Sequence, residues 1–196
     1  MIIVPNVINE SGRGNDIFSH SLENRNILLI GEINDEMSAS VISQFLYLDA
    51  TEDEPINLYI NSPGGSVTAG LSIYDTMKSL KNEVYTICMG QAASMAAVIL
   101  SGGEKRYALT HSEVMIHQPS GGIDGQSADI AIVANHIEKI REELNLILAK
   151  NCGRTGEEIT QKTDRDFWMN AKEALEFGII DEIVEERSRK NEEGQA

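Results

Sequence analysis

The hydroxyl of Ser94 has unusually open surroundings for a residue in an apolar stretch. Its neighbours have small side chains or none: Gly90, Ala92, Ala93 and Ala96. The apolar pattern places Ser94 where a strand turns into a helix, and unpaired N–H groups at a helix start favour developing negative charge. Ser94 is therefore either a reactive hydroxyl that a substrate backbone can approach, or a common helix N-cap within an Ala-rich packing contact.

Two adjacent glycines, Gly64 and Gly65, follow Pro63 at the point where an apolar strand ends. Glycines leave room for backbone N–H groups to point into open space, which is one way to build an oxyanion hole. Proline and glycine also form ordinary tight turns, so the same residues have a purely structural interpretation. The stretch lacks the Lys and the glycine spacing of a phosphate-binding loop.

An imidazole and a carboxylate stand at two further places where they could assist a hydroxyl. His117 ends an apolar strand and enters a Gly-rich loop, and strand ends are where α/β folds keep reactive groups. Asp166 lies in an acidic loop beside two aromatic residues, where a carboxylate could accept the other imidazole N–H. Taken singly, His117 is more often structural, and Asp166 is more often a surface charge paired with a neighbour such as Arg165.

Bulk composition predicts one globular domain to hold these residues, since 196 residues with 41% hydrophobic and 24% charged are too few for two ordinary domains. A formal charge of -15 argues against nucleic acid or an anionic membrane as main partner, because both recruit Lys and Arg. The chain lacks a signal-peptide pattern and any run of roughly 18 apolar residues, so we expect a cytoplasmic protein. Cys88 and Cys152 lack metal-ligand companions, so we expect free thiols and no metal site.

Strands and helices alternate along most of the chain, which predicts an α/β fold with a parallel sheet and right-handed crossovers. Apolar runs predict strands at 27–30, 56–60, 84–88, 106–109, 113–116 and 179–184. Helical spacing and capping residues predict helices that begin near Asn34, Ser66, Ser94, Thr155 and Asn170. Between the last two of these helices, residues 163–169 are predicted to form a loop.

Residues 126–150 differ from the rest, since they contain no Gly or Pro and place apolar residues at helical spacing. At 1.5 Å per residue such a helix would be about 37 Å long, so we expect it to protrude and to pack on another subunit. The polar residues 6–16 predict a mobile N-terminal segment, and the charged C-terminal tail predicts disorder.

Four stretches, in this order and spacing, resemble the family of ClpP, the proteolytic subunit of Clp proteases. They are residues 59–65 (YINSPGG), 73–77 (IYDTM), 86–95 (TICMGQAASM) and 115–119 (MIHQP). The likeness extends from Val4 to Val184. It implies a ClpP/crotonase-like α/β fold, in which repeated ββα units build a mainly parallel sheet and a long helix protrudes.

The resemblance also implies roles for the residues singled out above. It implies a serine endopeptidase in which Ser94 is the nucleophile, His117 the general base and then acid, and Asp166 the orienting carboxylate. The backbone N–H groups of Gly65 and Met95 would hold the oxyanion. The chemistry of the residues agrees, because a hydroxyl is inert until a base takes its proton and the carboxylate stabilises the imidazolium that forms.

Assembly and partners are likewise implied. Family members form two stacked heptameric rings around a chamber, so the resemblance implies a homo-oligomer in which the helix at 126–150 joins ring to ring. A hexameric AAA+ ATPase uses the ATP and threads unfolded polypeptides into the chamber, and the chain itself needs no cofactor. Asp164 and Arg165 match positions that couple ring contact to triad alignment. The implied organisation is an axial-pore segment at 1–17, a peptidase domain at 18–186 and a disordered tail at 187–196.

Two residues depart from the family pattern: Ala96 stands where Gly is usual, and Ser120 where a larger apolar residue is usual. The pore segment between Gly14 and Ile17 is also shorter than the family norm. These departures motivate a second hypothesis, a ring subunit with weak or no activity alone that structures a mixed complex with an active paralogue. A third hypothesis is a crotonase-type acyl-coenzyme A hydratase or isomerase, which also uses paired N–H groups as an oxyanion hole.

Overall fold

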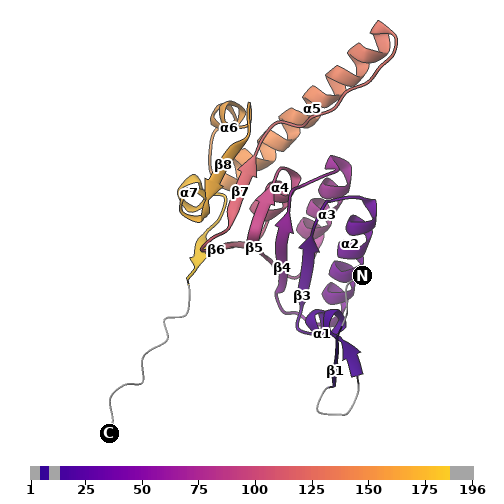
Figure 1. The fold of residues 1–196 in the computed structure, drawn as a ribbon, viewed down its shortest axis with the longest axis vertical. Helices are drawn as coiled ribbons and strands as arrows, with labels where there is room; N and C mark the ends of the chain where they lie inside the picture. Colours follow the sequence, from indigo (N-terminus) through magenta and orange to yellow (C-terminus); the bar gives the residue numbers. More distant parts are fainter. Residues whose placement is uncertain (1–4, 9–13, 186–196) are drawn as a thin grey trace.

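A seven-stranded, mainly parallel β-sheet forms the centre of the structure, a computed structural model that describes residues 5–8 and 14–185 (Figure 1). Five parallel strands lie side by side in the order β3 Asn26–Ile30, β4 Ile56–Ser62, β5 Val84–Ala93, β6 Lys105–Leu109 and β9 Glu182–Val184. Strand β7 Glu113–Ile116 is parallel to β5 and antiparallel to β8 Phe167–Asn170. The predicted α/β class with a mainly parallel sheet is thereby confirmed.

Strand β5 shares one of its edges between two neighbours. Its first half pairs with β6, up to Cys88↔Ala108, and its second half pairs with β7, up to Ala93↔Met115. The sequence predicted a strand that ends at residue 88. It continues to Ala93 because β7, which comes later in the chain, supplies the partners for the extension. The extension carries the following residue, Ser94, to the end of the sheet.

Three helices connect the parallel strands: α2 Asp35–Thr51, α3 Val67–Ser79 and α4 Met95–Ser101. Asn34 and Ser66 cap the first two, as predicted, by accepting hydrogen bonds from the N–H groups of Met37 and Ala69. Helix α4 is buried along its whole length. A short, fully buried helix behind the sheet fixes the position of the residue that precedes it, Ser94.

Helix α5 Ser127–Cys152 projects away from the rest of the molecule (Figure 1). Its buried residues all lie in its C-terminal third: Leu144, Asn145, Leu148 and Ala149. Towards its start, Ile130 and Ile132 are 44% and 68% exposed. The helix predicted at 126–150 is therefore present and protrudes. Neither α5 nor another helix in the described ranges has the length and apolarity that crossing a membrane requires.

The segment after α5 contains α6 Gly156–Lys162, β8 and α7 Ala171–Phe177. Both helices begin with the predicted capping boxes, built by Thr155 with Glu158 and by Asn170 with Glu173. The prediction of a loop at 163–169 is wrong for its second half, because β8 begins at Phe167 and pairs with β7. The last strand is also shorter than the predicted 179–184.

The N-terminal segment contains regular structure that the sequence did not predict. β1 Asn6–Ile8 and β2 Gly14–Asp16 pair antiparallel, and α1 Ile17–Glu23 follows directly. Asp16 caps α1 by accepting hydrogen bonds from the N–H groups of Phe18 and Ser19. The predicted mobile segment thus includes a strand pair. The remainder of the predicted pore segment, residues 1–4 and 9–13, and the predicted tail at 187–196 lie outside the described residues.

Both cysteines are free thiols, and burial raises the pKa of Cys88 and of Cys152 to about 11. Only the thiolate reacts with iodoacetamide. We therefore expect the folded protein to remain unmodified near pH 8, and to react as the pH approaches 11 or when denaturant exposes the thiols. Mass spectrometry of the two cysteine-containing peptides measures the reaction, and rapid modification of the folded protein near pH 8 would contradict the burial.

Candidate active site

Ser94 occupies a strained position between β5 and α4. Its backbone angles are φ 56° and ψ -122°, a combination that residues with a side chain rarely adopt. The Ser94 N–H donates to the carbonyl of Met115 at 2.8 Å, which holds the turn against β7. The Ser94 side chain accepts no hydrogen bond from the start of α4. The N-cap interpretation of Ser94 is therefore wrong, and its hydroxyl points elsewhere.

The hydroxyl contacts an imidazole that comes from the end of β7. Nε2 of His117 lies 2.8 Å from Oγ of Ser94, and Nδ1 of His117 lies 3.0 Å from Oδ1 of Asp166. The His117 side chain is mostly covered, at 27% exposure, whereas that of Asp166 is 62% exposed. The structure thus brings the three side chains predicted from distant parts of the sequence into one chain of hydrogen bonds.

Gln118 and Thr163, which had no role in the sequence analysis, connect the segment that carries the imidazole to the segment that carries the carboxylate. Gln118, next to His117, donates its backbone N–H to the carbonyl of Thr163 at 2.6 Å. Its side-chain amide donates to the carbonyl of Asp164 at 2.8 Å. The loop that precedes Asp166 is therefore tied to the chain that follows His117. Gln118 lies inside the motif 115–119, but a hydrogen bond to a residue so far away leaves no local pattern.

The glycine pair lies directly beside Ser94. Gly64 has φ 93°, and a Cβ atom built on it would lie 2.7 Å from Cβ of Ser94 and 3.1 Å from N of Met95. Ile33 bridges this turn, because its N–H donates to Gly64 and its carbonyl accepts from Ser66, both at 2.8 Å. Within the described residues, the N–H groups of Gly65 and Met95 donate to no other protein group. Both remain available for a ligand.

A cavity adjoins the hydroxyl and the imidazole. It is lined mainly by apolar side chains, among them Val67, Val98, Leu144 and Leu148. Pro119 also lines it, whereas Ser120 does not and is exposed. The departure at Ser120 therefore lies outside the wall of this cavity.

The two charged residues before Asp166 pair with each other at the surface. Nη1 of Arg165 lies 3.2 Å from Oδ2 of Asp164, and their side chains are 83% and 58% exposed. Within the described residues, neither side chain bonds to Ser94, His117 or Asp166. The side chain of Arg165 is thus accessible to a neighbouring molecule.

Among the described residues, the site combines a hydroxyl, an imidazole that is hydrogen-bonded to it and to a carboxylate, and two N–H groups that bond to no other protein group. These are the parts that acyl transfer requires. In the part of the chain that the structure describes, no group of three or more His, Cys, Asp or Glu side chains could hold a metal ion.

One comparison with known proteins bears on this site. A family model described as Clp protease matches residues 9–187. The match begins after β1, continues past the end of β9, and includes Ser94, His117 and Asp166 together with the glycine pair. The likeness seen in four short motifs is thus confirmed over nearly the whole length. Since the match covers far more than half of its residues, this chain belongs to the Clp protease family.

Proposed function

We propose that the protein is a serine endopeptidase, and the observation that carries the proposal is the hydrogen-bonded order Ser94, His117, Asp166. Nε2 of His117 removes the proton of the Ser94 hydroxyl as Oγ attacks the peptide carbonyl carbon. His117 then donates this proton to the leaving amine, which departs as the carbon–nitrogen bond breaks and leaves an ester on Ser94. A water molecule, deprotonated in the same way, hydrolyses the ester and restores the hydroxyl.

The other groups act on charge in this mechanism. The N–H groups of Gly65 and Met95 stabilise the oxyanion of both tetrahedral intermediates, because they are fixed by the backbone before the reaction begins. The Asp166 carboxylate holds the imidazole in the required tautomer and stabilises the imidazolium. The strained backbone of Ser94 supports its role as the nucleophile, because it turns the hydroxyl away from α4 and towards His117.

We further propose that the protein acts as an ATP-dependent protease subunit in the cytoplasm, in two stacked heptameric rings. The exposed apolar residues of α5 support an assembly, since a helix that projects alone leaves them uncovered. Rings would enclose the sites, and a hexameric AAA+ ATPase would supply unfolded polypeptides and consume the ATP. The exposed pair of Asp164 and Arg165 would then meet the opposite ring.

The purified protein tests these proposals directly. We expect a fluorophosphonate probe to modify the peptide that contains Ser94, a fluorogenic peptide to be hydrolysed, and native mass spectrometry to give fourteen subunits. Assembly without labelling or hydrolysis would instead favour a ring subunit that depends on an active paralogue. Turnover of an enoyl thioester by a Ser94→Ala variant would favour crotonase-type chemistry.

The cavity beside Ser94 predicts which residue precedes the cleaved bond. Its walls are mainly apolar and its volume is about 20 Å³, so a side chain enters only as the walls move apart, and a charged one would lose its hydration without gaining a charged partner. We expect kcat/KM for peptides with Leu or Met at this position to exceed that for Asp by roughly 10- to 100-fold. Matched fluorogenic peptides that differ at this one residue measure the ratio. Equal rates would show that the cavity does not receive that side chain.

A further inference from the structure

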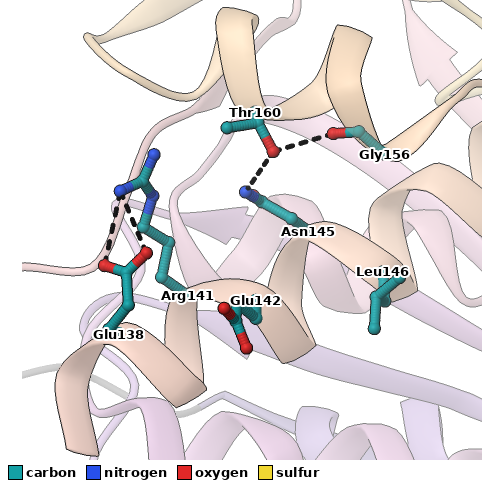
Figure 2. A pocket seen from close by; sticks show the side chains of 7 residues that line it. All are labelled: Glu138, Arg141, Glu142, Asn145, Leu146, Gly156 and Thr160. Carbon is teal, nitrogen blue, oxygen red and sulfur yellow. Dashed lines mark hydrogen bonds and ion pairs between the residues drawn. The ribbon is translucent and has the colours of Figure 1, made fainter. Parts of the chain in front are cut away.

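One amide is buried among apolar residues at the base of the long helix. Asn145 is 7% exposed and is the only polar residue among the four buried residues of α5. It lies between two hollows. On one side it lines the cavity beside Ser94, and on the other it lines a hollow of about 390 Å³ between α5 and α6 (Figure 2).

Each end of the Asn145 amide has a hydroxyl partner. Nδ2 donates to Oγ1 of Thr160 at 3.2 Å, and that hydroxyl donates to the carbonyl of Gly156, as Figure 2 shows. Oδ1 lies 3.1 Å from Oγ1 of Thr163, whose hydroxyl proton is shared between Oδ1 and the carbonyl of Ile159 at 2.9 Å. Thr163 is fully buried. A buried amide that loses such a partner is costly, because water cannot replace it. The bond to Thr163 therefore fixes α5 against the loop that begins there.

Thr163 is also connected through the main chain to both His117 and Asp166. Its carbonyl accepts the N–H of Gln118, the residue after His117, at 2.6 Å. Three residues further along the same chain is Asp166, whose carboxylate contacts the imidazole. A displacement of Thr163 would thus move the imidazole and the carboxylate relative to Ser94. Besides the apolar contacts of Leu144 and Leu148 at the cavity, the buried hydrogen bond between Asn145 and Thr163 connects the position of α5 to His117 and Asp166.

We propose that Asn145 and Thr163 are a positioning pair, which aligns His117 and Asp166 according to where α5 sits. This inference rests on the proposed peptidase function. Neither residue reacts: Asn145 acts through Thr163, and Thr163 through the main chain on either side of it. Leu144, Leu148 and Ala149 already attach α5 to the domain by apolar contact. The additional polar bond fixes the distance and register of the loop, which apolar packing alone leaves less defined.

Threonine variants separate positioning from simple stability. Thr163→Val keeps the shape but removes the bonds to Asn145 and to the carbonyl of Ile159, whereas Asn145→Leu removes the first of these alone. A misplacement of about 1 Å at a reacting group costs roughly 10²-fold in rate. We expect kcat for a fluorogenic peptide to fall by roughly 10- to 100-fold, with KM changed by less than about twofold. Thr163→Ser restores the hydroxyl and is expected to recover most of kcat.

Thr160→Val is the matched control, because it removes a hydroxyl from the opposite end of the same amide. Thr160 and the Nδ2 end of the Asn145 amide face the open hollow, where water can replace the lost Thr160 hydroxyl. We expect its kcat to stay within about twofold of the unchanged protein. Native mass spectrometry and thermal unfolding of each variant show whether its assembly and stability are kept.

Several results would overturn the pairing. They are an equal loss of kcat in Thr160→Val and Thr163→Val, a rise in KM with kcat unchanged, or no recovery in Thr163→Ser. If Thr163→Val does not fold, Asn145→Leu removes the same bond from the helix side, and full kcat in that variant would equally overturn it. A failure of the peptidase proposal is recognised separately, because the unchanged protein would then neither hydrolyse the peptide nor label at Ser94.

Discussion

A Ser94→Ala variant will lose peptide hydrolysis and fluorophosphonate labelling while keeping its fold and assembly. Within the described part of the chain, the Ser94 hydroxyl makes one hydrogen bond, to His117, and caps no helix, so its removal leaves no buried group unpaired there. Alanine has the same Cβ atom and meets the same strained backbone, so the free energy of unfolding should change little. Loss of the nucleophile of a triad lowers kcat by on the order of 10⁶-fold. Rates with a fluorogenic peptide and the labelled fraction measure the effect.

Ser43→Ala provides a matched control for this loss. Ser43 lies on the exposed face of α2, and among the residues that the structure describes its hydroxyl bonds only to the carbonyl of Ala39 in its own helix. The same chemical change should therefore leave hydrolysis and labelling intact. If the Ser94→Ala protein still hydrolysed peptides at a comparable rate, another residue would have to be the nucleophile. Native mass spectrometry must first show that the preparation contains no contaminating active protease.

A Gly64→Ala variant is expected to lose roughly 10²- to 10³-fold in kcat, the usual cost of losing one oxyanion donor. The added methyl group would lie 2.7 Å from both Cβ of Ser94 and the carbonyl of Ala93, and these are atoms of the turn itself. The φ of 93° at Gly64 is strained for alanine as well. The turn must therefore shift, which moves the N–H of Gly65 and the Ser94 hydroxyl apart. Kinetics with a small peptide measures kcat and KM separately.

Gly156→Ala is the corresponding control, since a Cβ atom there meets nothing within 4 Å. Gly156 is the first residue of α6, where alanine is well tolerated. We expect unchanged kcat in this variant. A Gly64→Ala protein with full kcat would show that the glycine pair is only a turn, and that the oxyanion is held by other donors.

Local sequence rules predicted the helix starts well, because a cap needs only residues three or four positions apart. Asn34, Ser66, Thr155 and Asn170 all cap the helices that they were predicted to cap. Ser94 was the exception, and its backbone explains why. A residue with positive φ does not turn its oxygen towards the following N–H groups, and no feature of the sequence alone reports that angle.

The predicted strand boundaries were wrong where the pairing partner is distant in the sequence. The extension of β5 to Ala93 and the pairing of β8 both depend on β7. The apolar run in β8, Phe167 to Met169, is too short to indicate a strand by itself. The same limit applied to the site. Residue types identified Ser94, His117 and Asp166 as candidates, and only the resemblance to a family connected them, because β7 and β8 bring the last two together. Thr163 and Asn145 escaped notice since ordinary polar residues inside or beside a helix carry no signal of burial.

A ribosome synthesises Ser94 and His117 well before it reaches β8. Strand β8 pairs with β7 through Ile116↔Phe167, and this pairing is what brings Asp166 to the imidazole. On the proposed mechanism, an unfinished chain therefore holds a serine and a histidine without the carboxylate that orients them. Until β8 has paired with β7, peptide hydrolysis would be slower by on the order of 10⁴-fold, and truncated products that end before β8 would share this loss.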